Sequence, residues 1–167
     1  MRKIWSLLHA GLGASGRPAE SLGLMKSMTD PNTRCPCGTG ETYGACCHRY
    51  HAEYEATGQL TAPTPEALMR SRFTAFAVAD APYLLATWHP STRPASLDLD
   101  QTLHWYRLDI LGTSGSVFET TGTVHFAAYY RSVPGTAPDA RVKGVQEENS
   151  RFVKETGSWF YLDGDMA

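Results

Sequence analysis

The sequence lacks any apolar run near the roughly 20 residues that a membrane-spanning helix needs. It also lacks an excess of positive charge, since 15 Lys and Arg stand against 17 Asp and Glu, a formal net charge of −2. Proteins that bind nucleic acid without sequence preference use a cationic surface. The charge balance therefore argues against a nucleic-acid partner, although a local basic cluster could still form from Arg34, Arg49, Arg70 and Arg72.

Cysteine is absent outside one short segment, which holds Cys35, Cys37, Cys46 and Cys47. Four thiolates this close together predict a tetrahedral zinc site. Bridges between Cys35 and Cys37 or between Cys46 and Cys47 would be strained, so the disulfide alternative requires pairing across the two clusters. An iron–sulfur cluster is a further alternative. Zinc with four protein ligands leaves no position for water or substrate, so we expect structural Zn²⁺.

Residues 1–33 show no helical or strand period and are crowded with Gly and Pro, which predicts a disordered N-terminal extension. Their apolar run, Ile4–Leu8, is shorter than the roughly 7–15 residues of a signal-peptide core. Met25 and Met28 are alternatives to Met1 as the start of the chain. Clustered cysteines stay reduced and bind metal in the cytoplasm, which is the location we expect.

Two helices are predicted after a cysteine module over residues 34–60. Thr64 and Pro65 are suited to begin the first helix, and Met69 and Phe73 fall on one apolar face of a helix that runs to about residue 79. Asp80 begins a second helix, which His89 and Pro90 stop. A short helical turn is predicted over residues 97–103.

Strands dominate the remaining sequence. We predict strands over residues 106–111, 117–131, 145–155 and 159–162, with turns at 112–115 and at Gly157 and a loop over 134–138. Helices followed by an antiparallel meander indicate an α+β domain over residues 61–167. Its helices would pack on one face of a curved sheet, which can form a cone with a ligand in its mouth.

The segment from Cys35 to Arg49, C-P-C-G-T-G-E-T-Y-G-A-C-C-H-R, resembles the SEC-C zinc motif. The resemblance implies Cys35, Cys37, Cys46 and Cys47 as ligands, with His48 as the alternative to Cys47. Further segments resemble the YchJ family, also called UPF0225: L-M-R-S-R-F from Leu68, T-W-H-P-S-T from Thr87, S-R-F-V from Ser150, W-F-Y from Trp159 and D-G from Asp163. This resemblance covers residues 34–164 and implies an NTF2-like cone joined to an N-terminal SEC-C module.

The function that we expect is the binding of a protein partner through the SEC-C module, or of a ligand in the cone. A homodimer formed through paired sheets is a further expectation. The alternative is a small enzyme of isomerase, dehydratase or hydrolase type that uses the cone pocket. Its candidate catalytic residues are His89, Arg70 and Tyr106. The pocket could be lined by Tyr106, Tyr130, Trp159 and Tyr161, with Asp109, Glu119 or Glu148 as its carboxylate.

Overall fold

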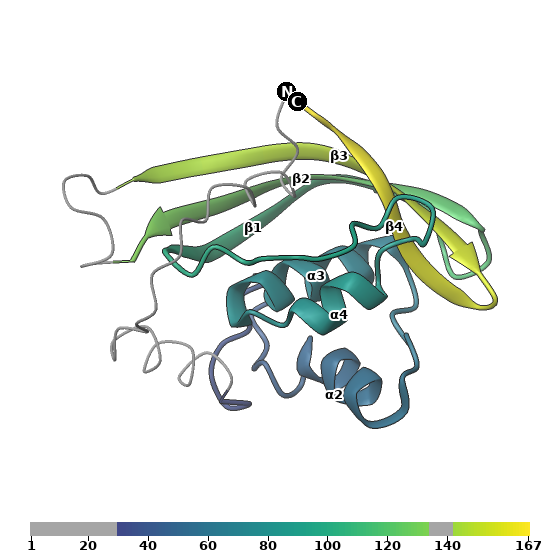
Figure 1. Cartoon of the computed structure of the whole chain (residues 1–167), viewed down its shortest axis with the longest axis horizontal. Coiled ribbons are helices and arrows are strands. Elements are labelled where there is room, and N and C mark those ends of the chain that lie inside the picture. The colour runs from purple at the N-terminus through teal and green to yellow at the C-terminus, as the bar shows by residue number, and fades with distance from the viewer. Residues whose placement is uncertain (1–29, 134–141) are drawn as a thin grey trace.

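The computed structural model describes residues 30–133 and 142–167. Its helices lie on one face of a four-stranded sheet in which each strand is antiparallel to the next along the chain (Figure 1). The elements are α2 (His48–Thr57), α3 (Pro65–Val78), α4 (Ala81–Ala86), β1 (Leu103–Ser114), β2 (Thr121–Ser132), β3 (Lys143–Glu155) and β4 (Ser158–Met166). α3 and α4 lie next to the sheet, and α2 lies beyond them. This arrangement confirms the predicted α+β class.

The two helices that cover the sheet begin where the sequence predicts. The side chain of Thr64 accepts a hydrogen bond from the Ala67 amide at 3.1 Å, and Pro65 occupies the first helical position of α3. Asp80 caps α4 in the same way by accepting from the Tyr83 amide at 3.1 Å. Within the described ranges, the helices fall short of the length and apolar character of a membrane span.

The inner face of the sheet follows the predicted alternation. Val124, Phe126 and Ala128 of β2 are buried on the face that α3 covers, and alternate residues of β3 are buried on the same face of the sheet. The β3 residues on this face are Gln146, Glu148, Ser150 and Phe152. Three of these four are polar, so the interior between α3 and the sheet carries hydrogen-bonding groups as well as apolar side chains.

The turn between β3 and β4 also follows the prediction. Thr156 and Gly157 both have positive φ, of 49° and 87°, which is the backbone of a two-residue hairpin turn. β1 is longer than predicted and continues to Ser114 through two register shifts, so the turn starts at Gly115 rather than at residue 112. The predicted N-terminal disorder falls mainly on residues 1–29, and the predicted loop over 134–138 falls on 134–141; both lie outside the described residues.

The predicted helical turn over residues 97–103 is wrong. Residues 97–100 have no regular secondary structure, and β1 begins at Leu103. The Asp100 carboxylate accepts hydrogen bonds from the Thr102 amide at 2.9 Å and from the Thr102 hydroxyl at 2.6 Å. This side-chain turn competes with a helix for the same backbone amide and leads the chain directly into the strand.

Candidate metal centre and adjoining pocket

The four cysteine sulfurs form one cluster, with all four Sγ atoms within 4.8 Å of one another. Sγ of Cys46 lies 3.5 Å from Sγ of Cys37 and 3.8 Å from Sγ of Cys47. A tetrahedron with metal–sulfur bonds of about 2.3 Å has sulfur–sulfur edges of about 3.8 Å. The residues therefore fit a four-coordinate metal ion, and a metal held by all four would have no open coordination position.

Two segments of backbone bring these sulfurs together. Gly38 and Gly40 have φ of 83° and 93°, which lets the first pair of cysteines fold back on itself. The Cys35 amide donates to the carbonyl of Glu41 at 2.9 Å and closes this loop. Cys47 is the N-cap residue of α2, so the second pair of cysteines lies at the start of a helix. From here on, the name cysteine module is used for residues 30–47, which precede α2, and no longer for the whole of the predicted segment 34–60.

Two hydroxyl groups lie against the sulfurs. Thr39 Oγ1 is 3.3 Å from Sγ of Cys46 and 3.6 Å from Sγ of Cys37, and Thr74 Oγ1 of α3 is 3.6 Å from Sγ of Cys35. Hydroxyls at these distances can donate to thiolates and offset their charge. The module thus takes part of its second layer of contacts from the helical domain.

Contacts within the cluster shift the pKa values of Cys35 and Cys47 in opposite directions. Hydrogen bonds from Cys37 and Cys47 lower the pKa of Cys35 to about 3. Hydrogen bonds with Cys35 and Cys37, followed by burial, raise the pKa of Cys47. Four thiols packed this closely cannot all ionise unless a cation lies among them, so the cluster has the chemistry of a metal-binding site.

α3 anchors the cysteine module to the sheet domain. Arg70 Nη1 donates to the Cys37 carbonyl at 2.8 Å, while its Nε donates to Glu66 at 2.8 Å. His51 Nε2 donates to the Ser71 carbonyl at 3.0 Å. Arg70, a candidate catalytic residue from the sequence, therefore holds the backbone beside a cysteine.

The other two catalytic candidates lie elsewhere. His89 accepts a hydrogen bond at Nδ1 from Ser91 Oγ at 2.6 Å, and its Nε2 is 3.1 Å from a carboxylate oxygen of Glu155. Tyr106 of β1 is 40% exposed, and its ring lies near Tyr129. Among the described residues, His89, Arg70 and Tyr106 share no hydrogen-bonding, ionic or ring partner, so the structure does not assemble the three into one site.

Arg72 cannot contribute to the basic surface cluster that the sequence offered. Arg72 is fully buried, and its Cζ lies 4.8 Å from the ring centre of Tyr161 and 5.3 Å from that of Trp88. Its Nη1 donates to the Leu84 carbonyl at 2.8 Å. Burial lowers the pKa of Arg72 to about 10, while Tyr161 and nearby charges oppose that shift. Its position four residues after Leu68, on the apolar face of α3, is the sequence signal for this burial.

Among residues 30–133 and 142–167, Glu148 is the carboxylate that is buried in the interior of the cone. Glu148 Oε1 accepts hydrogen bonds from Ser150 Oγ at 2.7 Å and from the Tyr161 hydroxyl at 2.9 Å. Glu148 and Tyr161 are both at most 1% exposed, and Gly164 of β4 packs directly against the carboxylate. Of the predicted pocket aromatics, Trp159 and Tyr161 are buried in the core, and Tyr106 lies outside it.

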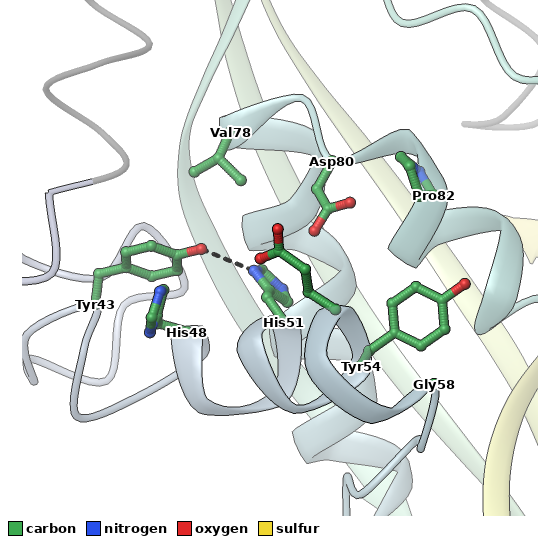
Figure 2. A pocket seen from close by; sticks show the side chains of 9 residues that line it. Tyr43, His48, His51, Tyr54, Gly58, Val78, Asp80 and Pro82 are labelled. Carbon is green, nitrogen blue, oxygen red and sulfur yellow. Dashed lines mark hydrogen bonds between the residues drawn. The ribbon is translucent and has the colours of Figure 1, made fainter.

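A pocket of about 620 Å³ lies outside the cone, between the cysteine module, α2 and the turn from α3 to α4. Figure 2 shows Asp80 above α2, with Tyr43 and His48 on one side and Tyr54 on the other. This junction pocket is lined by Tyr43, His48, His51, Tyr54, Glu55, Gly58, Val78, Asp80 and Pro82. These residues come from three separate segments, and no local sequence pattern marks them as a site.

Hydrogen bonds fix the wall of the junction pocket. Because His51 Nε2 donates to a carbonyl, its Nδ1 accepts from the Tyr43 hydroxyl, 2.9 Å away. Burial lowers the pKa of His51. Burial also raises the pKa of Tyr43, and the charges of Asp80, Cys47, Cys35 and Glu55 raise it further. His48 packs edge-on against Tyr43 with ring centres 5.0 Å apart.

Comparison with known proteins assigns both parts of the chain. Residues 32–49 match the SEC-C motif, and residues 64–164 match the middle NTF2-like domain of YchJ. A UPF0225 protein of Corynebacterium glutamicum is 54% identical over 134 residues, which cover 80% of this chain and 97% of the relative. The chain belongs to the UPF0225 (YchJ) family. A second UPF0225 protein, from Streptomyces coelicolor, is 50% identical over 137 residues, 81% of this chain and 98% of the relative.

Solved structures support the UPF0225 assignment. The solution structure of a SEC-C motif containing protein from Rhodopseudomonas palustris is 33% identical, with a TM-score of 0.63, and covers 81% of this chain and 99% of that one. The crystal structure of a SEC-C motif containing protein from Psychrobacter arcticus is 25% identical, also with a TM-score of 0.63, and covers 82% of this chain and 84% of that one. The predicted family and fold are thus confirmed, whereas the domain boundary at residue 60 stays a prediction.

Proposed function

We propose that this UPF0225 chain is a zinc-stabilised binding protein that holds a protein partner where the SEC-C module meets the NTF2-like domain. The observation that carries the proposal is the set of four cysteine sulfurs within 4.8 Å of one another. Four protein ligands close the site, so a metal there supports structure and recognition and leaves no position for a substrate.

Zinc is the ion that this donor set favours. Four thiolates at tetrahedral spacing suit Zn²⁺ or iron, and a module with few apolar residues of its own needs the metal to fold. The sulfurs of Cys35, Cys37, Cys46 and Cys47 would bind the ion, and the hydroxyls of Thr39 and Thr74 would each donate to one of them. The proposal includes a cytoplasmic location, because thiols stay reduced there.

Packing inside the cone supports binding over catalysis. Trp159 and Tyr161 are each 1% exposed and belong to the same core cluster as Phe126 and Phe152. The junction pocket lies outside this core and is partly walled by the SEC-C module. A partner that contacts the module would therefore reach the pocket without any opening of the cone.

One observation favours the alternative, a small enzyme that uses the cone. Glu148 Oε2 is buried and has no hydrogen-bond partner among the described residues, although Oε1 has two. A buried carboxylate beside a tyrosine hydroxyl is a common acid–base arrangement. The close packing of Gly164 against the carboxylate argues against this role, because it leaves substrate no space on that side.

Native mass spectrometry of the protein purified from its own host without chelator tests the proposal. We expect one zinc ion per chain and a protein partner that is lost together with the zinc in Cys46→Ser. The control Glu53→Gln changes one half-buried residue of α2 that lies outside the cysteine cluster, and it should keep both. Iron in place of zinc would refute the choice of metal. A small organic molecule that is released by Tyr161→Phe, with no protein partner, would favour the enzyme.

A further inference from the structure

We infer that the junction pocket binds a cationic nitrogen on an aliphatic stem, in the form of a Lys or Arg side chain from a basic segment of the protein partner. This inference rests on the proposed function and names the chemistry that its partner must present. The pocket volume of about 620 Å³ falls within the range of roughly 300–1,000 Å³ that is usual for ligand sites. It is large enough to admit a long side chain together with some of its neighbouring backbone.

Charge is the first argument for a cation. The nine lining residues include two carboxylates, Glu55 and Asp80, and no Lys or Arg. The one fully enclosed imidazole, His51, donates to the Ser71 carbonyl and accepts from Tyr43, an arrangement in which the ring is neutral. Four thiolates and one Zn²⁺ in the adjoining module would add a net charge of about −2. An anionic ligand would be repelled from such a pocket.

Aromatic rings are the second argument. Tyr43, His48 and Tyr54 stand around the pocket (Figure 2), and a cation over the face of a tyrosine ring is attracted by its quadrupole. The Tyr43 hydroxyl donates its hydrogen bond to His51. Its oxygen therefore keeps a lone pair that can accept a hydrogen bond from an ammonium or guanidinium N–H. The pocket therefore offers a cation two kinds of attraction, from aromatic ring faces and from oxygen atoms that accept hydrogen bonds.

The remaining wall suits an alkyl stem. Val78, Pro82 and Gly58 contribute apolar surface next to the carboxylates. Lys and Arg carry a charged head on a chain of methylene groups and bury that chain along apolar surface. Free amines share this chemistry, but they lack a backbone that could contact the SEC-C module beside the pocket. For this reason we assign the cation to a protein segment.

The test is a two-dimensional ¹H–¹⁵N NMR titration of the full-length, zinc-loaded chain at pH 8, where imidazoles are neutral. The probes are acetyl-GGKGG-amide, the same peptide with Arg, Glu or acetyl-lysine in place of Lys, and free n-butylamine. We expect the Lys and Arg peptides to shift amides near Tyr43, Tyr54 and Asp80, and the Glu and acetyl-lysine peptides not to do so. Added salt should weaken binding.

Two designed variants test the groups in the pocket. Glu55→Gln with Asp80→Asn removes both charges, and Asn can still accept from Tyr83 to cap α4. This pair should weaken binding of the Lys peptide about tenfold, and Tyr54→Leu should weaken it about two- to fivefold. The matched control Glu53→Gln with Asp98→Asn also removes two carboxylates, one half-buried and one exposed, but neither residue lines the pocket, so affinity should stay within about twofold.

The outcomes separate the possibilities. Binding of n-butylamine as tightly as the Lys peptide would overturn the protein source and leave a free amine as the ligand. Equal binding of the acetyl-lysine peptide, equal weakening by the control pair, or no shift with any amine up to roughly 10 mM would overturn the inference. Metal analysis of the same samples distinguishes failure of this inference from failure of the proposed function. If the chain contains zinc but binds no amine, only the inferred cation site is refuted. If the purified chain contains no zinc, the proposed function is refuted. The peptide titration of that zinc-free chain then shows whether the junction pocket still binds a cation.

Discussion

Gly164→Ala tests whether the interior of the cone is as tightly filled as the proposed function requires. Gly164 of β4 pairs with Ser150 of β3 and lies beside the Glu148 side chain. A methyl group at this position would overlap Glu148 Oε1 and would lie 2.5 Å from its Cδ and 2.8 Å from its Cγ. The carboxylate must therefore move, although the Tyr161 and Ser150 hydroxyls hold its oxygen.

Two effects of Gly164→Ala lower the free energy of unfolding, and one smaller effect raises it. Overpacking a core costs about 1–3 kcal/mol. Displacing the carboxylate also loses at least one hydrogen bond to a charged group, worth about 1.5–3 kcal/mol. The lower entropy of the unfolded alanine chain returns about 0.4–1 kcal/mol. We therefore expect Gly164→Ala to lower the free energy of unfolding by about 2–5 kcal/mol.

Urea unfolding followed by tryptophan fluorescence measures this change, because Trp88, Trp105 and Trp159 are all buried in the core. The matched control is Gly112→Ala in β1, where the nearest atom to a new methyl group is His125 Cβ at 4.0 Å. This control should be neutral or more stable by about 0.5 kcal/mol.

A double-mutant cycle identifies the obstructing group. If Glu148 causes the penalty, Gly164→Ala should cost less than about 1 kcal/mol in a Glu148→Ala background. The same penalty in both backgrounds, or no penalty at all, would refute the reasoning. The second result would mean that the carboxylate has space to swing away, which would revive the cone as a candidate active site.

Two further predictions concern the metal site and the outer sheet. Thr39→Val removes the hydroxyl that lies against Cys37 and Cys46, and we expect it to weaken zinc binding about tenfold in a chelator competition, with no effect if that hydroxyl faces solvent instead. Burial and then Arg131 lower the pKa of His104 from 6.5, so the unfolded chain binds a proton more readily and stability should fall as the pH drops below about 6.5. An NMR titration should place this pKa below 6.5 and move it upward in Arg131→Gln; an identical value in both proteins would contradict the contribution of Arg131.

The parts of the molecule that the sequence predicts well are those that local chemistry decides. The four cysteines lie within one short segment, so two glycine turns and a helix start suffice to bring their sulfurs together. The inner residues of β3 alternate, and a strand buried on one face can satisfy that alternation in a single register. Thr64 and Asp80 act within one helical turn of their own positions.

The parts that escaped prediction depend on distant segments or on a single competing side chain. The helical turn expected near residue 100 does not form, because the Asp100 carboxylate accepts a hydrogen bond from the Thr102 amide two residues away. The junction pocket joins Tyr43, α2 and the turn at Asp80, and only the packing of the module on α3 determines their spacing. The enclosure of Glu148 likewise needs Gly164 on another strand.

α3 connects the candidate metal centre to the junction pocket, because residues along this one helix contact both. Along this single helix, Arg70 binds the Cys37 carbonyl, the Ser71 carbonyl accepts from His51, and Thr74 lies against the Cys35 sulfur. The helix then ends beside Asp80, which forms the opposite wall of the pocket. A metal bound by the four cysteines would fix the module, and the module positions Tyr43, whose hydroxyl donates to His51. A closed metal site can therefore serve recognition without touching a ligand, because it sets the position of one wall relative to the other.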